Sequence, residues 1–250
     1  MKDDLWVKSK YYQYSKSAPL LIYLSGWDIK MWYQRPLFRH VSKKGFNVLA
    51  FSYSRDILKP NPDPKKHFER FKTIYDQIKK ISDQYIADST DLNIIGSSVG
   101  STLGFILGSE YSDKTKNVVL NLYTSDFVES LWKWKKDMYK LLSKDFAKHV
   151  ENKDIYLSTG KSIDDARKDW IFMRLQTHVN KYNPNKTKFL LYSSLKDKII
   201  PFEKNDQLEE SLKSGNFNYK RIINKQSRGH LTAGFINLIK TNQWIEFLKS

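Results

Sequence analysis

Short apolar runs alternate with amphipathic segments along most of the chain. Six of these runs are predicted as strands, and several of them are apolar on consecutive positions. Consecutive rather than alternating apolar residues are typical of a parallel sheet that is covered on both faces. The predicted strands span residues 19–24, 46–54, 92–97, 117–123, 188–194 and 219–224.

Amphipathic helices are predicted between the strands. The clearest has apolar residues at steps of three and four, which define one buried face: Phe68, Phe71, Ile74, Ile78, Ile81 and Tyr85. A shorter helix is predicted from Pro36, because proline suits a first turn, to about Gly45. Strands that alternate with helices predict an α/β fold with a mostly parallel sheet flanked by helices. Further helices are predicted after residue 97 and over about 202–213 and 232–248.

The segment between the fourth and fifth predicted strands interrupts this alternation, because it contains no good strand. Many of its apolar residues share one helical face, and its lysines fall largely elsewhere. Ser162 and Asp165 have the spacing of a capping box, which predicts another helix through Trp170 and Met173. The expected division is a core of residues 1–126 and 183–250 with a helical cap inserted at residues 127–182.

The formal net charge of +16 at pH 7 raises the question of an anionic partner. Lysines supply most of the positive charge, whereas nucleic-acid sites favour arginine, and the charge is spread along the whole chain without a block or a recognisable binding motif. We therefore expect no nucleic-acid partner. Weak association with an anionic membrane surface stays open as an alternative.

The chain has no cysteine, which excludes disulfides, thiolate catalysis and cysteine-ligated metal sites. Its first residues carry acids and no apolar run, so they do not resemble a signal peptide. No apolar stretch approaches the roughly 20 residues that a membrane span needs. The expectation is a cytoplasmic protein.

Four of the ten glycines fall in one stretch, residues 93–108, "NIIGSSVGSTLGFILG". Gly96 and Gly100 flank Ser98 in a G-x-S-x-G pattern between a predicted strand and a predicted helix. A serine on such a sharp turn needs small neighbours, and the helix amino terminus can stabilise the oxyanion that forms when the serine attacks a carbonyl. Ser98 is thus a candidate nucleophile, although this pattern also arises by chance and needs partners elsewhere in the chain.

A serine nucleophile needs a base and an acid that orients the base, expected in the chain order Ser, Asp or Glu, His. His230, in "SRGHLTAGF", is the histidine that follows the last predicted strand. Asp197, in "SSLKDKIIPF", follows the strand at 188–194 and is the favoured acid. Asp126, in "LYTSDF", follows the preceding strand and is the alternative acid.

With these motifs the chain resembles the α/β-hydrolase family over nearly its whole length. "GSSVG" is similar to the nucleophile elbow, "RGH" to the histidine loop, and "SLKDKIIP" to the acid loop G-x-x-D-x-x-V-P, with Ser194 and Ile200 at the Gly and Val positions. The family's oxyanion loop usually reads His-Gly, and "LSGWD" stands here instead. The resemblance implies that the backbone N–H groups of Trp27 and Val99 form the oxyanion hole.

The resemblance also implies a function: a serine hydrolase that cleaves a small-molecule carboxylic ester through an acyl-enzyme intermediate, with no cofactor and no metal. The apolar face of the expected cap would favour acyl chains of medium length. A peptidase, amidase or thioesterase with the same triad is one alternative, and a non-catalytic protein that binds an anionic ligand or a membrane surface is another. The expected pocket residues of the cap are Trp132, Met138, Tyr139, Leu142 and Phe146.

Overall fold

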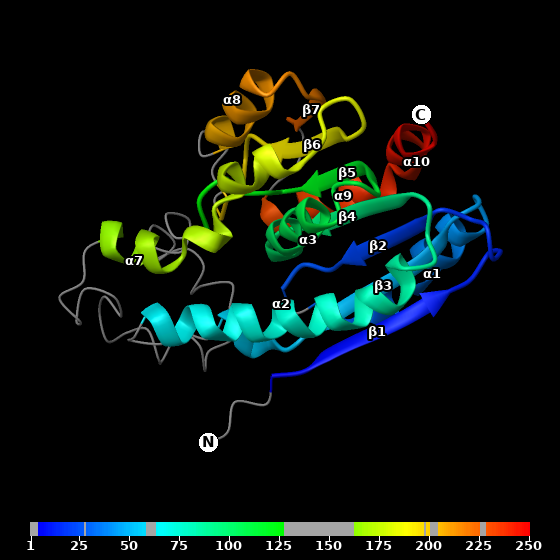
Figure 1. The fold of residues 1–250 in the computed structure, drawn as a ribbon, viewed down its shortest axis with the longest axis horizontal. Coiled ribbons are helices and arrows are strands. Elements are labelled where there is room, and N and C mark those ends of the chain that lie inside the picture. The colour runs from blue at the N-terminus through cyan, green and yellow to red at the C-terminus, as the bar shows by residue number, and fades with distance from the viewer. Residues whose placement is uncertain are drawn as a thin grey trace.

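A single sheet organises the computed structural model, which describes residues 5–27, 29–58, 64–127, 163–197, 199–200, 205–225 and 229–250. Within them the sheet has seven strands in the order β1-β3-β2-β4-β5-β6-β7 (Figure 1). β1 pairs with β3 in antiparallel register, and every other neighbouring pair is parallel. The strands are β1 (Val7–Tyr12), β2 (Leu20–Leu24), β3 (Asn47–Tyr53), β4 (Leu92–Ser97), β5 (Thr115–Asn121), β6 (Lys188–Ser194) and β7 (Asn218–Asn224).

Helices cover both faces of this sheet (Figure 1). On one face, α2 (Pro64–Ile86), α3 (Val99–Glu110) and α8 (Asp206–Ser214) bury residues such as Ile94 and Leu120. On the other face, α1 (Met31–Ser42), α9 (His230–Ile239) and α10 (Thr241–Lys249) bury residues such as Ile95 and Val119. Because both faces are covered, every residue of β2, β3 and β4 is buried, which confirms the predicted α/β class.

The structure describes part of the segment predicted as a cap. Phe127, Trp170 and Met173 pack in the same cluster as α2, whereas Leu175 and Val179 pack on the α3 side. Helix α7 (Ile163–Asp169) ends before Trp170 rather than continuing through Met173, because the chain turns there and buries the Trp170 indole. Two 3₁₀ turns follow, Ile171–Met173 and Leu175–Lys181. The predicted cap residues Trp132, Met138, Tyr139, Leu142 and Phe146, together with Ser162, lie outside the described residues.

Other predicted boundaries were also wrong. The first helix begins at Met31 rather than Pro36, because Met31 packs against the same apolar cluster as Phe38. Pro36 is exposed near the amino terminus of this helix, where it costs only one hydrogen bond and is tolerated. The last helix is two helices, since Lys240 leaves helical conformation with ψ of 50° and lets Trp244 turn into the core. The predicted fourth strand ends at Asn121, because Leu122 has a left-handed φ of 55°.

Strand β1 was not predicted from the sequence. Its central residues Lys8, Ser9 and Lys10 are exposed, so it carries no apolar run. It is held by pairing with β3, where Lys8 lies opposite Ser52 and Lys10 opposite Ala50. A polar, lysine-bearing strand at a sheet edge is typical, because charge there opposes pairing with another chain.

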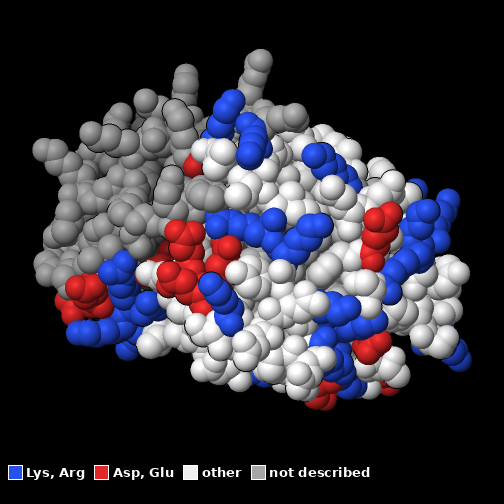
Figure 2. Space-filling model, turned by 90° about the horizontal axis from the view of Figure 1, so that it is seen from above, with Lys and Arg blue, Asp and Glu red and all other residues white. Residues whose placement is uncertain are grey.

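The positive charge does not form one block on the face of the described residues that Figure 2 shows. Figure 2 shows Lys and Arg side chains in several separate groups among neutral residues and carboxylates. Within the described residues, no helix combines the length and the hydropathy that crossing a bilayer would need.

Candidate active site

Ser98 lies on a sharp turn between β4 and α3. Its backbone has φ of 54° and ψ of −123°, a conformation that is strained for a residue with a Cβ. The turn brings α3 so close to the sheet that a Cβ on Gly96 would lie 2.3 Å from the Gly100 carbonyl oxygen. A Cβ on Gly100 would lie 2.4 Å from the carbonyl oxygens of both Leu24 and Ser25. Since these neighbours are backbone atoms, the turn requires glycine at both positions.

Hydrogen bonds hold this turn from the neighbouring strand. The Ser98 N–H donates to the Asn121 carbonyl oxygen at 2.8 Å. The Ser101 hydroxyl donates to the Gly96 carbonyl oxygen at 2.8 Å and to the Asn121 carbonyl oxygen at 3.0 Å. Ser101 is buried, so its hydroxyl has a structural role within the turn.

Three predicted site residues meet at the carboxyl edge of the sheet. His230 Nε2 lies 3.0 Å from Ser98 Oγ, and His230 Nδ1 lies 2.7 Å from Asp197 Oδ2. A carboxylate at Nδ1 favours the tautomer with its proton there, which leaves Nε2 able to accept the serine hydroxyl proton. The other oxygen of Asp197 accepts the N–H groups of Ile199 and Ile200, each at 2.9 Å. The arrangement can therefore deprotonate Ser98 and stabilise the imidazolium that results.

The loop after β2 lies beside Ser98. A Cβ on Gly26 would be 3.5 Å from the Ser98 Cβ, and Trp27 follows directly. The Tyr53 hydroxyl donates to the Ser25 carbonyl oxygen in this loop. Burial raises the pKa of Tyr53 well above its ordinary value, so the hydroxyl stays protonated and keeps donating. On the other side of Ser98, Val99 is the first residue of α3, where backbone N–H groups have no partner within the helix.

Asp126, the alternative acid, occupies a different environment. It is buried, pairs with Arg167 Nε at 2.9 Å and forms an isolated antiparallel bridge with Arg174. Its carboxylate therefore links the end of the segment that follows β5 to Arg167 of α7. Among the described residues, no group of three or more His, Asp and Glu side chains could hold a metal ion.

The other described histidines have structural surroundings. His178 is buried and its Nε2 lies 2.7 Å from the Phe172 carbonyl oxygen. His67 is buried edge-on against Trp170, and burial, with a smaller contribution from Arg70, lowers its pKa to about 3. His40 lies exposed on α1, and His149 falls outside the described residues.

A buried amide network beneath Ser98 was not predicted from the sequence. The Asn121 side-chain nitrogen donates to Ser97 Oγ and to the Gly234 carbonyl oxygen, both at 3.0 Å. Its oxygen accepts from the Asn237 amide at 3.0 Å. Gly234 and Asn237 belong to α9, whose first residue is His230, so Asn121 connects the serine turn to the histidine helix. The sequence offered one indication of such a network, namely the two asparagines within the otherwise apolar run "NVVLNLY".

Comparison with known proteins assigns the fold. No family model matches the chain, and no curated protein matches its sequence. The structure is similar to an esterase of Pyrococcus furiosus, with a TM-score of 0.62 and 18% identity over 99% of this chain and 87% of that one. It is also similar to an acylaminoacyl peptidase of Pyrococcus horikoshii, with a TM-score of 0.65 and 15% identity over 97% of this chain and 39% of that one.

A third similar structure is Est1E from Butyrivibrio proteoclasticus, with a TM-score of 0.59 and 17% identity over 98% of this chain and 94% of that one. A mostly parallel sheet, helices on both faces and the strand-turn-helix at Ser98 agree with these similarities. The chain therefore has the α/β-hydrolase fold, as its sequence motifs predicted.

The amide network generates a prediction about Ser98 reactivity. We expect Asn121→Ala to slow labelling of Ser98 by a fluorophosphonate about tenfold or more, because small displacements of paired reacting groups are costly. Asn117→Ala is the matched control. Asn117 is a buried asparagine of the same strand, but its amide bonds to Asn93 and to the Leu248 carbonyl oxygen, at the other end of β5. Equal labelling rates in two variants of similar urea midpoint would contradict the predicted role of Asn121.

Proposed function

We propose that this protein is a serine hydrolase that cleaves a small-molecule carboxylic ester. The observation that carries the proposal is the chain of contacts from Ser98 Oγ through both nitrogens of His230 to the buried Asp197 carboxylate. This geometry is that of a nucleophile, a general base and an orienting acid. The esterases and the peptidase with the same fold support hydrolase chemistry in general.

The proposed reaction has two steps. Ser98 Oγ attacks the ester carbonyl while His230 Nε2 takes the hydroxyl proton, and the N–H groups of Trp27 and Val99 stabilise the oxyanion. The tetrahedral intermediate collapses, and the protonated His230 gives its proton to the departing alcohol, which leaves the acyl group on Ser98. His230 then takes a proton from water, and the hydroxide attacks the acyl carbonyl. As the bond from the acyl carbon to Ser98 Oγ breaks, His230 returns the proton to Ser98 Oγ and the carboxylic acid leaves. Asp197 holds the imidazole in place through its contact with Nδ1 in both steps.

Amide cleavage is the second candidate. The structural similarity to an acylaminoacyl peptidase favours it, although this chain matches 39% of that protein. A thioester would suit the same triad. Comparing an ester, a thioester and an anilide of the same acid separates these substrates, because a site built for amides must protonate a poorer leaving group. A non-catalytic protein on this fold would turn over none of them.

Replacing Ser98 tests the proposal directly. We expect Ser98→Ala to abolish release of 4-nitrophenol from 4-nitrophenyl butyrate and to remove covalent labelling by a fluorophosphonate, with an unchanged melting temperature. Ser109→Ala is the matched control, because Ser109 lies on the same helix and its hydroxyl bonds to the Ile106 carbonyl oxygen, away from the turn. Full turnover by folded Ser98→Ala protein would reject the proposed nucleophile.

The two acids are distinguished by paired amide substitutions. Asp197→Asn should lower kcat by about 10⁴, because the amide no longer holds His230 in the required tautomer. Asp126→Asn should leave kcat within about threefold and lower stability instead, since it weakens a largely buried pair with Arg167. Steady-state kinetics and urea unfolding on both variants check the assignment. A large loss of kcat in Asp126→Asn and a small one in Asp197→Asn would identify Asp126 as the orienting acid.

We also propose a preference for medium acyl chains. An apolar pocket gains about 0.8 kcal/mol for each buried CH₂ group, or nearly fourfold, so kcat/KM should rise severalfold from acetate to hexanoate esters. If Trp132 and Phe146 contact the acyl chain, alanine at either position should flatten this rise more than it lowers acetate hydrolysis. A profile that falls from acetate to butyrate would mean a small pocket and reject the preference.

A further inference from the structure

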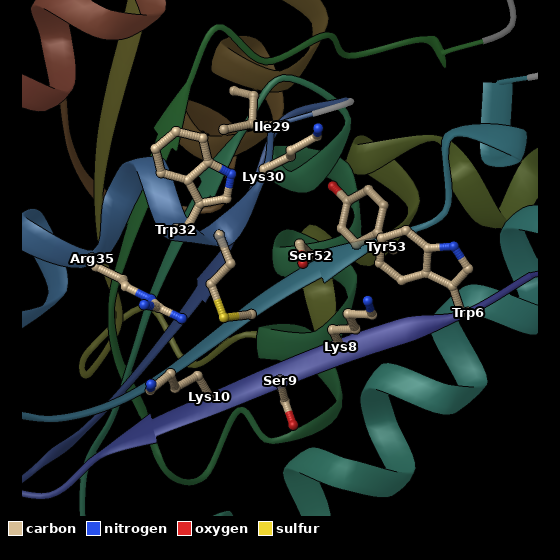
Figure 3. Close-up of a pocket in the computed structure, with 11 residues that line it drawn as sticks. Trp6, Lys8, Ser9, Lys10, Ile29, Lys30, Trp32, Arg35, Ser52 and Tyr53 are labelled. Atoms are coloured by element: carbon tan, nitrogen blue, oxygen red, sulfur yellow. The ribbon is translucent and has the colours of Figure 1, made fainter.

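A groove lies between the edge strand β1 and the start of α1 (Figure 3). Its volume is about 630 Å³, within the range that accommodates small organic ligands. Figure 3 shows residues from β1, β3, α1 and the loop before α1 around it, with Trp6 and Arg35 toward opposite ends of the view. The lining residues are Trp6, Lys8, Ser9, Lys10, Ile29, Lys30, Met31, Trp32, Arg35, Ser52 and Tyr53.

The groove is positively charged. Lys8, Lys10, Lys30 and Arg35 line it, and among the described residues that line it none is acidic. No carboxylate of the described residues forms an ion pair with any of the four. Some lysines elsewhere on the described surface pair with acids, as Lys72 does with Asp76. Lys8 Nζ lies 5.0 Å from the Trp6 ring centroid and Lys10 Nζ 5.7 Å from the Tyr12 ring centroid, and neither contact neutralises the charge. Four cations without an ion pair among the described residues favour an anionic ligand in this cavity.

Strand pairing explains why the charges converge. Lys8 and Lys10 are two residues apart, so their side chains leave the same face of β1. Their partners in β3 are Ser52 and Ala50, and Ala50 belongs to the cluster buried under α1. Both lysines therefore stand on the face that α1 covers, next to the first turns of the helix that carries Arg35.

The groove also has exposed aromatic surface. Trp32 is 55% exposed and Trp6 is 36% exposed. The Trp32 ring stacks on Tyr33, with ring centroids 3.6 Å apart. Large exposed tryptophans beside cations suit a flat apolar group that bears a negative charge, because the ring faces take the apolar part and the cations take the charge.

One wall of the groove adjoins the candidate active site. Tyr53 lines the groove and donates to the Ser25 carbonyl oxygen, which belongs to the loop beside Ser98. Ile29, another lining residue, has its Cδ1 3.2 Å from the position of a Cβ on Gly26, and that position is 3.5 Å from the Ser98 Cβ. Residues that line the groove therefore contact the same short loop that lies beside Ser98.

We propose that this groove binds the negatively charged end of the ester substrate, joined to an aromatic or other flat apolar group. The inference rests on the proposed function and narrows its substrate class to anionic esters. The charge would lie among Lys30, Arg35 and the lysines of β1, while the ester carbonyl reaches Ser98 across the loop that carries Trp27. Guanidinium and ammonium groups give charge-assisted hydrogen bonds to a carboxylate, sulfonate or phosphate.

A binding experiment tests the groove without requiring turnover. In the full-length Ser98→Ala protein, calorimetry should show naphthalene-1-sulfonate binding about tenfold or more tighter than neutral 1-naphthalenemethanol, because the cations recognise the charge. Arg35→Gln and Lys30→Gln in this background should each weaken sulfonate binding about fivefold to tenfold. Arg39→Gln is the matched control, since Arg39 is exposed one helical turn further along α1 and does not line the groove.

A kinetic experiment in the otherwise unaltered protein tests the link to the substrate. We compare 1-naphthyl butyrate with its 4-sulfonate, and 1-naphthyl hexanoate with the 1-naphthyl monoester of adipic acid. The charged member of at least one pair should have the higher kcat/KM. Arg35→Gln should remove that preference by raising KM with kcat nearly unchanged, whereas Arg39→Gln should preserve it.

The outcomes separate this inference from the proposed function. Ester turnover at Ser98 with no preference for charge, or sulfonate binding that is unaffected by Arg35→Gln and Lys30→Gln, would overturn the inference and leave the hydrolase intact. Sulfonate binding lost in both variants, with no ester cleaved, would support an anion-binding groove and reject the hydrolase. Binding to phosphatidylserine vesicles without binding of naphthalene-1-sulfonate would assign the groove to a lipid surface and overturn the inference.

Discussion

The close approach of helix α3 to strands β2 and β4 is the constraint on which the site depends. Gly96 and Gly100 leave no room for a Cβ, and their neighbours are backbone atoms that cannot move without moving the sheet. This contact forces the chain through a left-handed conformation at Ser98, which costs on the order of 1–3 kcal/mol for a residue with a side chain. The surrounding hydrogen bonds to the Asn121 carbonyl oxygen keep that conformation in place.

Buried side chains and backbone groups beneath the candidate site hold its residues in place. Asn121 accepts from the serine turn through its backbone and binds α9 through its side chain, so one residue fixes the serine and the helix that begins with His230. Asp197 is oriented by the N–H groups of Ile199 and Ile200. Because these supporting groups are buried in the sheet or belong to the backbone, the contacts among Ser98, His230 and Asp197 need no help from mobile surface side chains.

Much of this arrangement could be predicted because it is encoded locally. The buried strands are continuous apolar runs, and the G-x-S-x-G stretch lies between a strand and a helix, so both can be read within a few residues. The choice of Asp197 over Asp126 used the strand that each acid follows and the motif around Asp197, and the structure brings Asp197, not Asp126, to His230. The amide network could not be predicted, since Asn121 and Asn237 are joined only by tertiary packing.

Two of the errors of prediction lie at the proposed anion-binding groove. Strand β1 was not predicted, because Lys8 and Lys10 interrupt any apolar run. Helix α1 was predicted to begin too late, because Pro36 was taken as its first turn and the helix begins at Met31. Those two elements supply most of the groove's lining. A lysine-rich edge strand is explained by the protection of the sheet edge, whereas an exposed tryptophan at the start of a helix contributes little to the fold. Departures from local rules are expected where side chains are kept for a ligand, so the exposed Trp32 in the first turn of α1 supports the groove more than the missed strand does.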